Sequence, residues 1–341
     1  MKNKLNIVVI GCSNMANGHM KGIVEQENAV LYGICDSAPE RLAERKAQYN
    51  PTVATENYMD LVNDPNVDAA VIVTPDKLHL EMTAAFLRAG KDVLCEKPMA
   101  LTVAECEEMM RVEKETGRKL MIGQICRCTP GFIAAKELVD AGRIGELYFV
   151  ESEYAHSYAK ARGYNDWRVD PDRHAFIGGG CHAVDLLRWV AGNPTEVYAH
   201  ATHKVLTDWP VDDATIAIYK FPNNVSGKVF VSIGCKRNYT MRSVFYGTKG
   251  TIICDNKSPT IQLFEDNPEG GAPAFTTAQE IPVEINNHNT VAEIDVFVKA
   301  LLSGEPMPVS SMEGASTVAV CAASVQSAKV GKPVEIVYPK I

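Results

Sequence analysis

The chain has 341 residues, of which 46% are hydrophobic and 22% are charged, and its formal net charge is −8. This length is about twice that of a typical domain, so two domains are the default expectation. A net negative charge without any run of lysine or arginine argues against a nucleic acid or an anionic membrane as partner. We therefore expect a small-molecule partner.

The N-terminus predicts neither export nor membrane insertion. Its first apolar stretch is only about six residues long and ends at Gly11, too short for a signal peptide. No apolar run reaches the roughly 18 residues that would cross a bilayer. We expect a cytoplasmic protein with free buried thiols, because the 10 cysteines are scattered through a large chain. Cys126 and Cys128, or Cys181 with His182, lack the Cys-x-x-Cys spacing of a zinc site, so no metal is predicted.

Residues 1–123 alternate strand and helix patterns. The apolar run Leu5 to Ile10 is typical of a strand buried on both faces. Six strands with helical crossovers predict a doubly wound parallel sheet, the Rossmann arrangement. Its strands are expected at residues 5–10, 30–35, 52–54, 69–73, 92–95 and 119–122. Its helices are expected at about 14–25, 56–62, 77–89 and 103–116, with one more opened by Ser37-Ala38-Pro39-Glu40.

The pattern changes in residues 124–341. Helices are expected at about 130–141, 182–190, 289–303 and 311–329, and a long strand at 146–154. Between residues 196 and 264, consecutive strands separated by turns predict a large, open, mainly antiparallel sheet. The second domain, residues 124–341, is therefore α+β.

The first strand ends in a dinucleotide-binding loop. Gly11 and Ala16 fit the first and third positions of the G-x-G-x-x-G/A fingerprint, and Ser13 departs from it at the second. Glycine permits the tight turn, a small third residue lets the helix pack closely, and serine adds a hydroxyl donor. We expect Asn14 and Met15 to line the same loop.

Asp36 follows the second strand, where a carboxylate can accept hydrogen bonds from the adenosine ribose. The same charge repels a 2′-phosphate, which predicts NAD rather than NADP, although Arg41 nearby can soften the discrimination. The alternative is a helix N-cap. Thr74 and Pro75, after the fourth strand, are expected to line the cofactor, and His79 either contacts it or packs on that loop.

Lys97 is our first candidate for chemistry. The strand at 92–95 runs into Glu96 and Lys97, at the edge where open α/β sheets bind ligands. A partly desolvated lysine there can exchange a proton with a substrate hydroxyl, whereas the alternative is an exposed turn lysine. We expect both Glu96 and Lys97 to contact the cofactor.

Together these motifs resemble the Gfo/Idh/MocA family of NAD(P)-dependent oxidoreductases. The resemblance spans the chain and rests on the glycine loop, Thr74-Pro75 with His79, Glu96-Lys97-Pro98, Gly142-Arg143-Ile144-Gly145, Trp167-Arg168, and His182-Ala183-Val184-Asp185. It implies a Rossmann domain, a C-terminal sheet that mediates dimers or tetramers, and sugar or cyclitol substrates.

The resemblance also implies catalytic roles. The lysine matching Lys97 holds the reacting hydroxyl, and the histidine matching His182 takes its proton as hydride passes to nicotinamide C4. Imidazole titrates near neutral pH, which suits that task. Asp185, one helical turn later, can bind a substrate hydroxyl or orient the ring.

One position departs from the family. An aspartate commonly precedes the histidine by four residues, but this chain has Gly178 there, with Asp172 and His174 upstream as alternatives. Further substrate contacts are expected from aromatic rings that stack on sugars and from guanidinium groups. The candidates are Arg127, Tyr154 with His156 and Tyr158 on one strand face, Trp167 and Arg168.

The sequence therefore predicts an NAD-dependent dehydrogenase acting on a secondary hydroxyl of a sugar, sugar derivative or inositol. Two alternatives stay open. Tightly bound NAD could oxidise a sugar transiently during bond cleavage, or the protein could be a non-catalytic NAD-binding regulator. The dehydrogenase hypothesis requires Lys97 and His182, from separate domains, to act on one substrate beside the nicotinamide.

Overall fold

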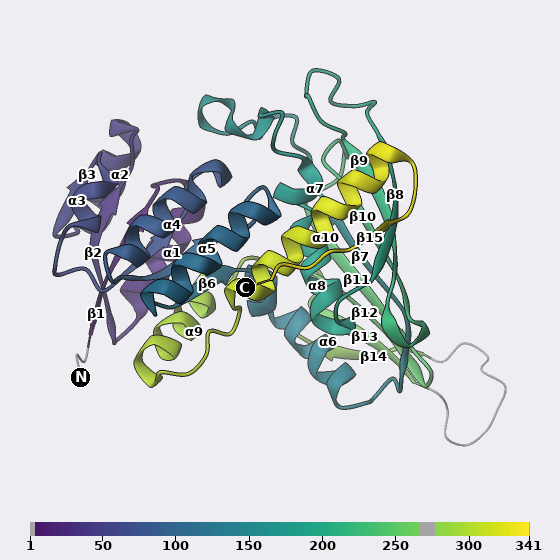
Figure 1. The fold of residues 1–341 in the computed structure, drawn as a ribbon. Helices are drawn as coiled ribbons and strands as arrows, with labels where there is room; N and C mark the ends of the chain where they lie inside the picture. The colour runs from purple at the N-terminus through teal and green to yellow at the C-terminus, as the bar shows by residue number, and fades with distance from the viewer. Residues whose placement is uncertain (1–3, 266–276, 341) are drawn as a thin grey trace. The chain divides into compact units, whose positions relative to one another are not determined.

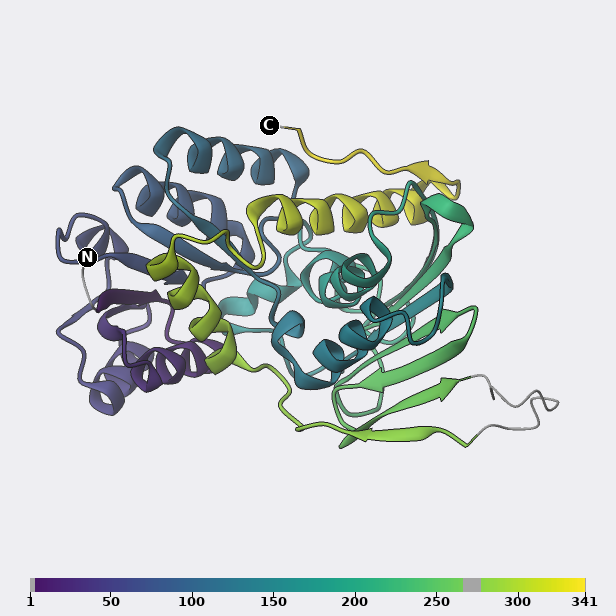
Figure 2. The same cartoon turned by 90° about the horizontal axis from the view of Figure 1, so that it is seen from below.

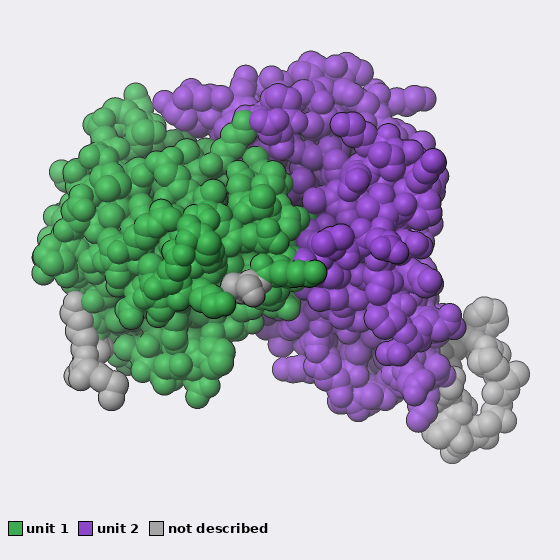
Figure 3. Space-filling view, in the orientation of Figure 1, with its two compact units in different colours: residues 1–125, 289–318, 339–341 green, residues 126–288, 319–338 purple. Residues whose placement is uncertain are grey.

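The computed structural model of the chain describes residues 4–265 and 277–340. Its contacts define two units, coloured green and purple in Figure 3. Unit 1 comprises residues 1–125, 289–318 and 339–341, and unit 2 comprises residues 126–288 and 319–338. The expected division into 1–123 and 124–341 differs because helix α9 (Thr290–Ser303) packs against helix α1 (Asn14–Glu25) in unit 1.

Unit 1 is built on a parallel six-stranded sheet with the order β3-β2-β1-β4-β5-β6. The predicted doubly wound sheet is confirmed. Its strands are β1 (Leu5–Ile10), β2 (Ala29–Cys35), β3 (Val53–Thr55), β4 (Ala69–Ile72), β5 (Asp92–Glu96) and β6 (Leu120–Gly123). Its other helices are α2 (Pro39–Tyr49), α3 (Tyr58–Val62), α4 (His79–Arg88) and α5 (Val103–Thr116), with a 3₁₀ turn η1 (Asp76–Leu78) before α4.

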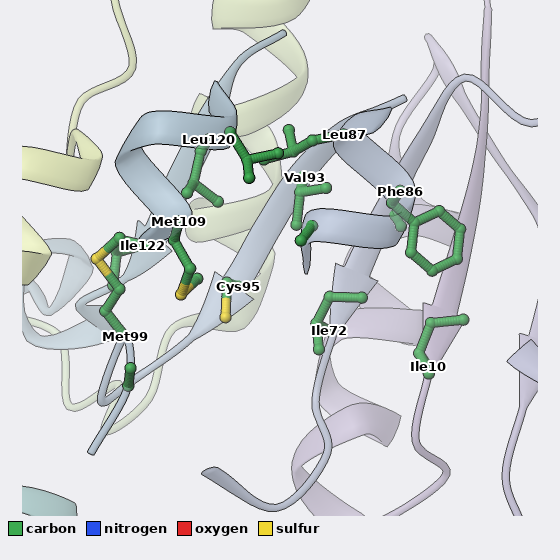
Figure 4. Packing of buried hydrophobic residues seen from close by; sticks show 14 of the residues in the cluster. Ile10, Ile72, Phe86, Leu87, Val93, Cys95, Met99, Met109, Leu120 and Ile122 are labelled. Carbon is green, nitrogen blue, oxygen red and sulfur yellow. The ribbon is translucent and has the colours of Figure 1, made fainter. Parts of the chain in front are cut away.

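Helices cover both faces of this sheet because β1 is apolar on both. Ile7 and Val9 pack with Met20 of α1 and Phe297 of α9. Val8 and Ile10 belong to the core on the opposite face. Figure 4 shows that second core, in which helices α4 and α5, side by side in Figure 1, contribute Phe86, Leu87 and Met109. The unbroken apolar run in the sequence is thus explained by burial on two sides.

Unit 2 contains a nine-stranded sheet with the order β14-β13-β12-β11-β7-β10-β9-β8-β15. Neighbouring strands are antiparallel except β10 and β7, which are parallel. The strands are β7 (Leu147–Ala155), β8 (Glu196–Thr202), β9 (Ala214–Lys220), β10 (Ser226–Ser232), β11 (Thr240–Gly247), β12 (Gly250–Asp255), β13 (Thr260–Glu265), β14 (Gln279–Pro282) and β15 (Val334–Glu335).

Helices pack on one face of the nine-stranded sheet. Helix α8 contacts β7, β10 and β11, and helix α6 contacts β12 and β13, as Figure 2 shows. The remaining helices and 3₁₀ segments are η2 (Ile125–Cys128), α6 (Pro130–Asp140), η3 (Tyr164–Val169), α7 (Ala175–Gly178), α8 (Cys181–Ala191), η4 (Pro222–Asn224) and α10 (Ser311–Val330). Helix α10 begins in unit 1 and continues into unit 2.

The opposite face of this sheet is open within the unit. Along β9, Ala217 and Tyr219 are buried on the helix side, whereas Ile216 and Ile218 are 40% and 53% exposed on the other. The predicted large, open, mainly antiparallel sheet is confirmed.

Candidate active site

The sheet order of unit 1 brings the predicted cofactor residues to one edge. β1 and β4 are neighbours, and their following helices α1 and α4 contribute to opposite cores. Such a switch point is where open α/β sheets bind ligands, outside the carboxyl ends of the strands. Gly11 follows β1, Asp36 follows β2, Thr74 follows β4, and Lys97 follows β5.

Gly11 lies where no side chain fits. Its φ is +105°, and a Cβ atom there would lie 2.5 Å from the carbonyl oxygen of Val73. Ser13 then caps α1, since its side chain accepts a hydrogen bond from the backbone N–H of Ala16 at 3.4 Å. The N-terminus of a helix favours an anion such as pyrophosphate, and the contact of this loop with the cofactor stays a prediction.

Asp36 joins two loops of this edge. Its Oδ2 accepts the backbone N–H of Cys12 at 2.7 Å, and its Oδ1 accepts the N–H of Ala38 at 2.8 Å and the guanidinium of Arg41 at 2.7 Å. Asp36 is only 6% exposed. A carboxylate has about four acceptor positions, so these bonds are compatible with a further ribose contact, which stays a prediction.

His79 ties the Thr74 loop to the segment after β5. Its Nδ1 lies 2.8 Å from the carbonyl oxygen of Pro98, and its Nε2 lies 3.1 Å from that of Thr74. Carbonyl oxygens only accept, so both ring nitrogens must carry protons. Burial lowers the pKa of His79, but Cys95, Asp76 and the Pro98 carbonyl outweigh it and raise the pKa to about 10. Direct contact of the fully buried ring with a cofactor stays a prediction.

Thr74 also offers a hydroxyl to a ligand. Its Oγ1 is buried and has no hydrogen-bond partner among the residues that the structure describes. An orphaned polar atom at the switch point fits a site whose cofactor supplies the missing partner.

Glu96 holds Lys97 through the backbone. The Oε2 of Glu96 accepts the N–H of Lys97 at 3.1 Å, and its Oε1 lies 2.8 Å from Nε2 of His19. The peptide bond between Lys97 and Pro98 is cis. Sequence reasoning missed His19, although a polar residue on the buried face of α1, beside Ala16, Met20 and Ile23, was a usable signal.

One group of side chains within residues 4–265 and 277–340 has the donors and spacing of a possible metal site. It consists of His19, Glu96 and Glu293, whose ligand atoms all lie within 4.8 Å of one another. All three side chains are buried.

In unit 2, His182 lies in the first turn of α8 and is 2% exposed. Its Nδ1 lies 3.3 Å from Sγ of Cys126. The ring stacks with Tyr154 and with His288, at centroid distances of 6.0 and 5.8 Å. The Tyr239 hydroxyl lies 3.1 Å from Nε2 of His288 and extends this aromatic group.

Tyr154, His156 and Tyr158 lie together, although only Tyr154 is in a strand. The Tyr154 hydroxyl lies 2.8 Å from that of Tyr158 and 3.3 Å from Nδ1 of His156. Strand β7 ends at Ala155, so the expected alternation along one strand is wrong for the two later residues. Burial raises the pKa of Tyr154 and of Tyr239, which keeps both phenols protonated as hydrogen-bond donors.

Asp185 and Arg127 form a buried ion pair. The Nε and one terminal nitrogen of Arg127 donate to the two carboxylate oxygens of Asp185, both at 2.8 Å. Asp185 is 0% exposed. Two residues that the sequence predicted separately as substrate contacts therefore bind each other, and their contact with substrate stays a prediction.

Arg173 fills the space beside Gly178. A Cβ atom on Gly178 would lie 2.2 Å from a terminal nitrogen of Arg173, whose guanidinium lies 4.7 Å from the centroid of Trp167. The Arg168 guanidinium also lies over Trp167, at 4.5 Å. A family-type aspartate at position 178 would require this arginine to move.

The two upstream alternatives to that aspartate differ in their surroundings. The Nδ1 of His174 accepts the backbone N–H of Phe176 and thereby caps α7, and burial lowers the pKa of His174. Asp172 is exposed.

Comparison with known proteins decides the family. A family model described as an oxidoreductase family with an NAD-binding Rossmann fold matches residues 5–124, and the GFO/IDH/MocA C-terminal domain matches residues 132–253. The chain belongs to the Gfo/Idh/MocA family. It is therefore an oxidoreductase whose Rossmann domain binds NAD.

Relatives match nearly the whole chain. Inositol 2-dehydrogenase 2 of Saccharopolyspora erythraea is 28% identical over 97% of this chain and 96% of its own length. Myo-inositol 2-dehydrogenase of Thermotoga maritima is 26% identical over 91% of this chain and 92% of its own length. A levoglucosan dehydrogenase solved with NADH has the same fold, with a TM-score of 0.86 at 22% identity over 99% of this chain and 100% of that chain.

Two further predictions concern the cysteines and membrane-spanning helices. None of the 10 cysteines forms a disulfide, as predicted, and all are buried except Cys235, which is partly exposed. Among the helices that the structure describes, none is long and apolar enough to cross a membrane.

We expect Cys12 to be chemically inert despite its place in the dinucleotide-binding loop. Burial, and after it the charge of Asp36, raises the pKa of Cys12 to about 12, so the reactive thiolate is scarce at pH 8. Iodoacetamide should label the less buried Cys235 about tenfold or more faster, as measured by peptide mass spectrometry. Equal labelling of the two thiols would contradict this.

We expect His79→Leu to destabilise unit 1 by about 2–3 kcal/mol at pH 6, since it leaves two buried carbonyl groups without donors. The pKa of His79 is raised in the folded state from 6.5 to about 10. The contribution is therefore fully present below pH 6.5 and is lost as the pH rises toward 10. Denaturant unfolding of both proteins at several pH values measures it, and a pH-independent difference would argue against a charged His79.

Proposed function

We propose that the chain is an NAD-dependent dehydrogenase that oxidises a secondary hydroxyl of a sugar, sugar derivative or inositol. The observation that carries this proposal is the convergence of the glycine loop, Asp36, Thr74 and Lys97 on the β1–β4 switch edge. The inositol dehydrogenases aligned over nearly the whole chain support the substrate class. The expected product pair is a ketone and NADH.

Lys97 is proposed to hold and polarise the reacting hydroxyl. It directly follows β5, and the bond from its backbone N–H to Glu96 fixes its main chain. An ammonium group placed there stabilises the negative charge that develops on the substrate oxygen. Bound NAD would supply the hydride acceptor, with Gly11, Ser13, Asn14, Met15, Ala16, Asp36, Thr74, Pro75 and Glu96 as its proposed contacts.

His182 is proposed to take the hydroxyl proton. The contact of its Nδ1 with Sγ of Cys126, at 3.3 Å, holds the imidazole in the first turn of α8. The stacked rings of Tyr154 and His288 restrict the imidazole to one plane. These aromatic faces suit a polyhydroxylated ring. Trp167 and Arg168 are proposed as further substrate contacts.

A second copy of the chain is proposed to cover the open face of the nine-stranded sheet. Exposed Tyr198, Ile216 and Ile218 give this face an apolar character. Its β7 and β10 strands carry the Glu151–Lys228 ion pair, so both charge signs are present. A two-fold contact can satisfy such a surface with itself. We further propose that the enzyme works in the cytoplasm, where its free thiols stay reduced.

Replacing Lys97 by methionine tests the catalytic proposal. We expect Lys97→Met to lower kcat by about a thousandfold, while NAD affinity changes less than about threefold. Stopped-flow NADH fluorescence with inositols and sugars, together with calorimetric NAD titration, measures both. The exposed Lys114 offers the charge-matched control Lys114→Met.

The same assay separates the alternatives. Substrate-dependent accumulation of NADH supports the dehydrogenase. Product without net NADH indicates transient oxidation, and NAD binding without turnover on a broad polyol panel indicates a regulator. Full activity of Lys97→Met would remove Lys97 from the mechanism.

Charging the open sheet face tests the assembly. We expect Ile218→Glu to lower the molar mass seen by light scattering to that of the monomer, because a buried unpaired charge costs more than the contact gains. Val24→Glu, on the exposed side of α1, is the control at a 57% exposed position. An unchanged mass for Ile218→Glu would exclude this face as the subunit interface.

A further inference from the structure

Three ionisable side chains of unit 1 meet in the core under the switch edge. His19 comes from α1, Glu96 from the end of β5 and Glu293 from α9, which packs against α1. His19 and Glu293 are 0% exposed and Glu96 is 6% exposed. Buried ionisable groups are costly unless each is paired, so their partners indicate what the cluster does.

The hydrogen-bond partners are unevenly distributed among these three side chains. Both oxygens of Glu96 are used, one by His19 Nε2 at 2.8 Å and one by the N–H of Lys97 at 3.1 Å. By contrast, Nδ1 of His19 and both oxygens of Glu293 are buried without a hydrogen-bond partner among the described residues. His19 Nδ1 lies 3.8 Å from Glu293 Oε2, slightly beyond hydrogen-bond distance.

Two ionised carboxylates cannot share this space without a compensating positive charge. Burial and the charge of Glu96 raise the pKa of Glu293 well above its usual range. For Glu96, burial is outweighed by the bond from His19 and by Lys97, and its pKa is lowered. The groups facing Glu293 are His19 from α1, and Glu96 and Lys97 at the end of β5.

The charge of Lys97 lowers the pKa of Glu293 but is outweighed by burial and by Glu96. The further positive charge is either a proton or a metal ion. Metal sites in proteins usually take three or four side-chain ligands. Here the atoms without partners come from only two residues, His19 and Glu293, since each oxygen of Glu96 already accepts one hydrogen bond. A proton needs only one donor and one acceptor, and those are the two atoms that face each other at 3.8 Å.

We propose that Glu293 is a neutral carboxylic acid in the folded enzyme and that it positions Lys97 through a chain of hydrogen bonds. The Glu293 hydroxyl donates to His19 Nδ1 after the gap closes by less than about 1 Å. His19 Nε2–H then donates to ionised Glu96, which accepts the N–H of Lys97. Glu293 and His19 are thus positioning residues for the lysine, and the kinetic part of this inference rests on the proposed dehydrogenase function.

Glu293→Gln tests the protonation state without any substrate. In the wild type, the infrared spectrum at pH 7 should contain the carbonyl band of a buried protonated acid, with its characteristic shift in D₂O. Glu293→Gln should lack that band. Asp295→Asn, on the same helix, is the matched control and should retain it, since Asp295 is partly exposed and paired with Lys299.

Thermal unfolding gives a second readout. With its pKa raised on folding, Glu293 holds its proton in the folded state but releases it in the unfolded state above about pH 4.5. The wild type therefore loses stability relative to Glu293→Gln as the pH rises from 4.5 toward the folded pKa. We expect the Tm advantage of Glu293→Gln to grow by about 2 °C or more between pH 4.5 and 8, and that of Asp295→Asn to stay constant.

Kinetics test the positioning role. The amide of Glu293→Gln can donate to His19 Nδ1 in place of the acid, so it should keep kcat within about fivefold, whereas Glu293→Leu should lower kcat about a hundredfold with NAD affinity little changed. Equal loss in both variants would overturn the positioning role. If the wild type shows the acid band but turns over no substrate, Glu293 is protonated as proposed and the proposed dehydrogenase function is wrong.

A metal ion would produce the opposite pattern. If the acid band is absent, and if Zn²⁺ or Mn²⁺ raises the Tm of the wild type but not of Glu293→Gln, the cluster holds a cation and the proton assignment is wrong.

Discussion

The close approach of Gly11 to β4 is the constraint on which the candidate site depends. A Cβ atom at position 11 would lie 2.5 Å from the Val73 carbonyl oxygen, so only glycine fits there. The backbone N–H of Gly11 also donates to Cys35 at the end of β2, and that of Val73 donates to Ile10. The ends of β1, β2 and β4 are thereby held together, and the loops that follow them start from fixed positions.

Charged and polar groups then join those loops to one another. Asp36 connects the glycine loop to the start of α2, and His79 connects the Thr74 loop to Pro98. Glu96 connects Lys97 to His19 of α1. In each case a buried polar side chain binds backbone groups that would otherwise lack partners. These bonds fix the loops in place without a bound ligand.

Unit 2 uses its sheet differently. The helix side of the sheet holds Tyr154 against His182, whereas the other side presents isoleucine and tyrosine side chains outward. One sheet thus supplies a protected aromatic environment for a titratable histidine and, on its opposite face, the surface that we propose for assembly.

The local sequence pattern determined much of the fold and of the candidate site. The apolar run of β1, the glycine at a positive φ and the lysine after β5 follow from residue type and periodicity, because burial on both faces, backbone sterics and strand ends are properties of a few neighbouring residues. The tertiary structure decided which polar groups meet. Glu96 and His19 are 77 residues apart, Arg127 and Asp185 are 58 apart, and Glu293 reaches the cluster only because α9 packs on α1. Such pairings depend on how distant elements pack, and no local periodicity encodes that packing.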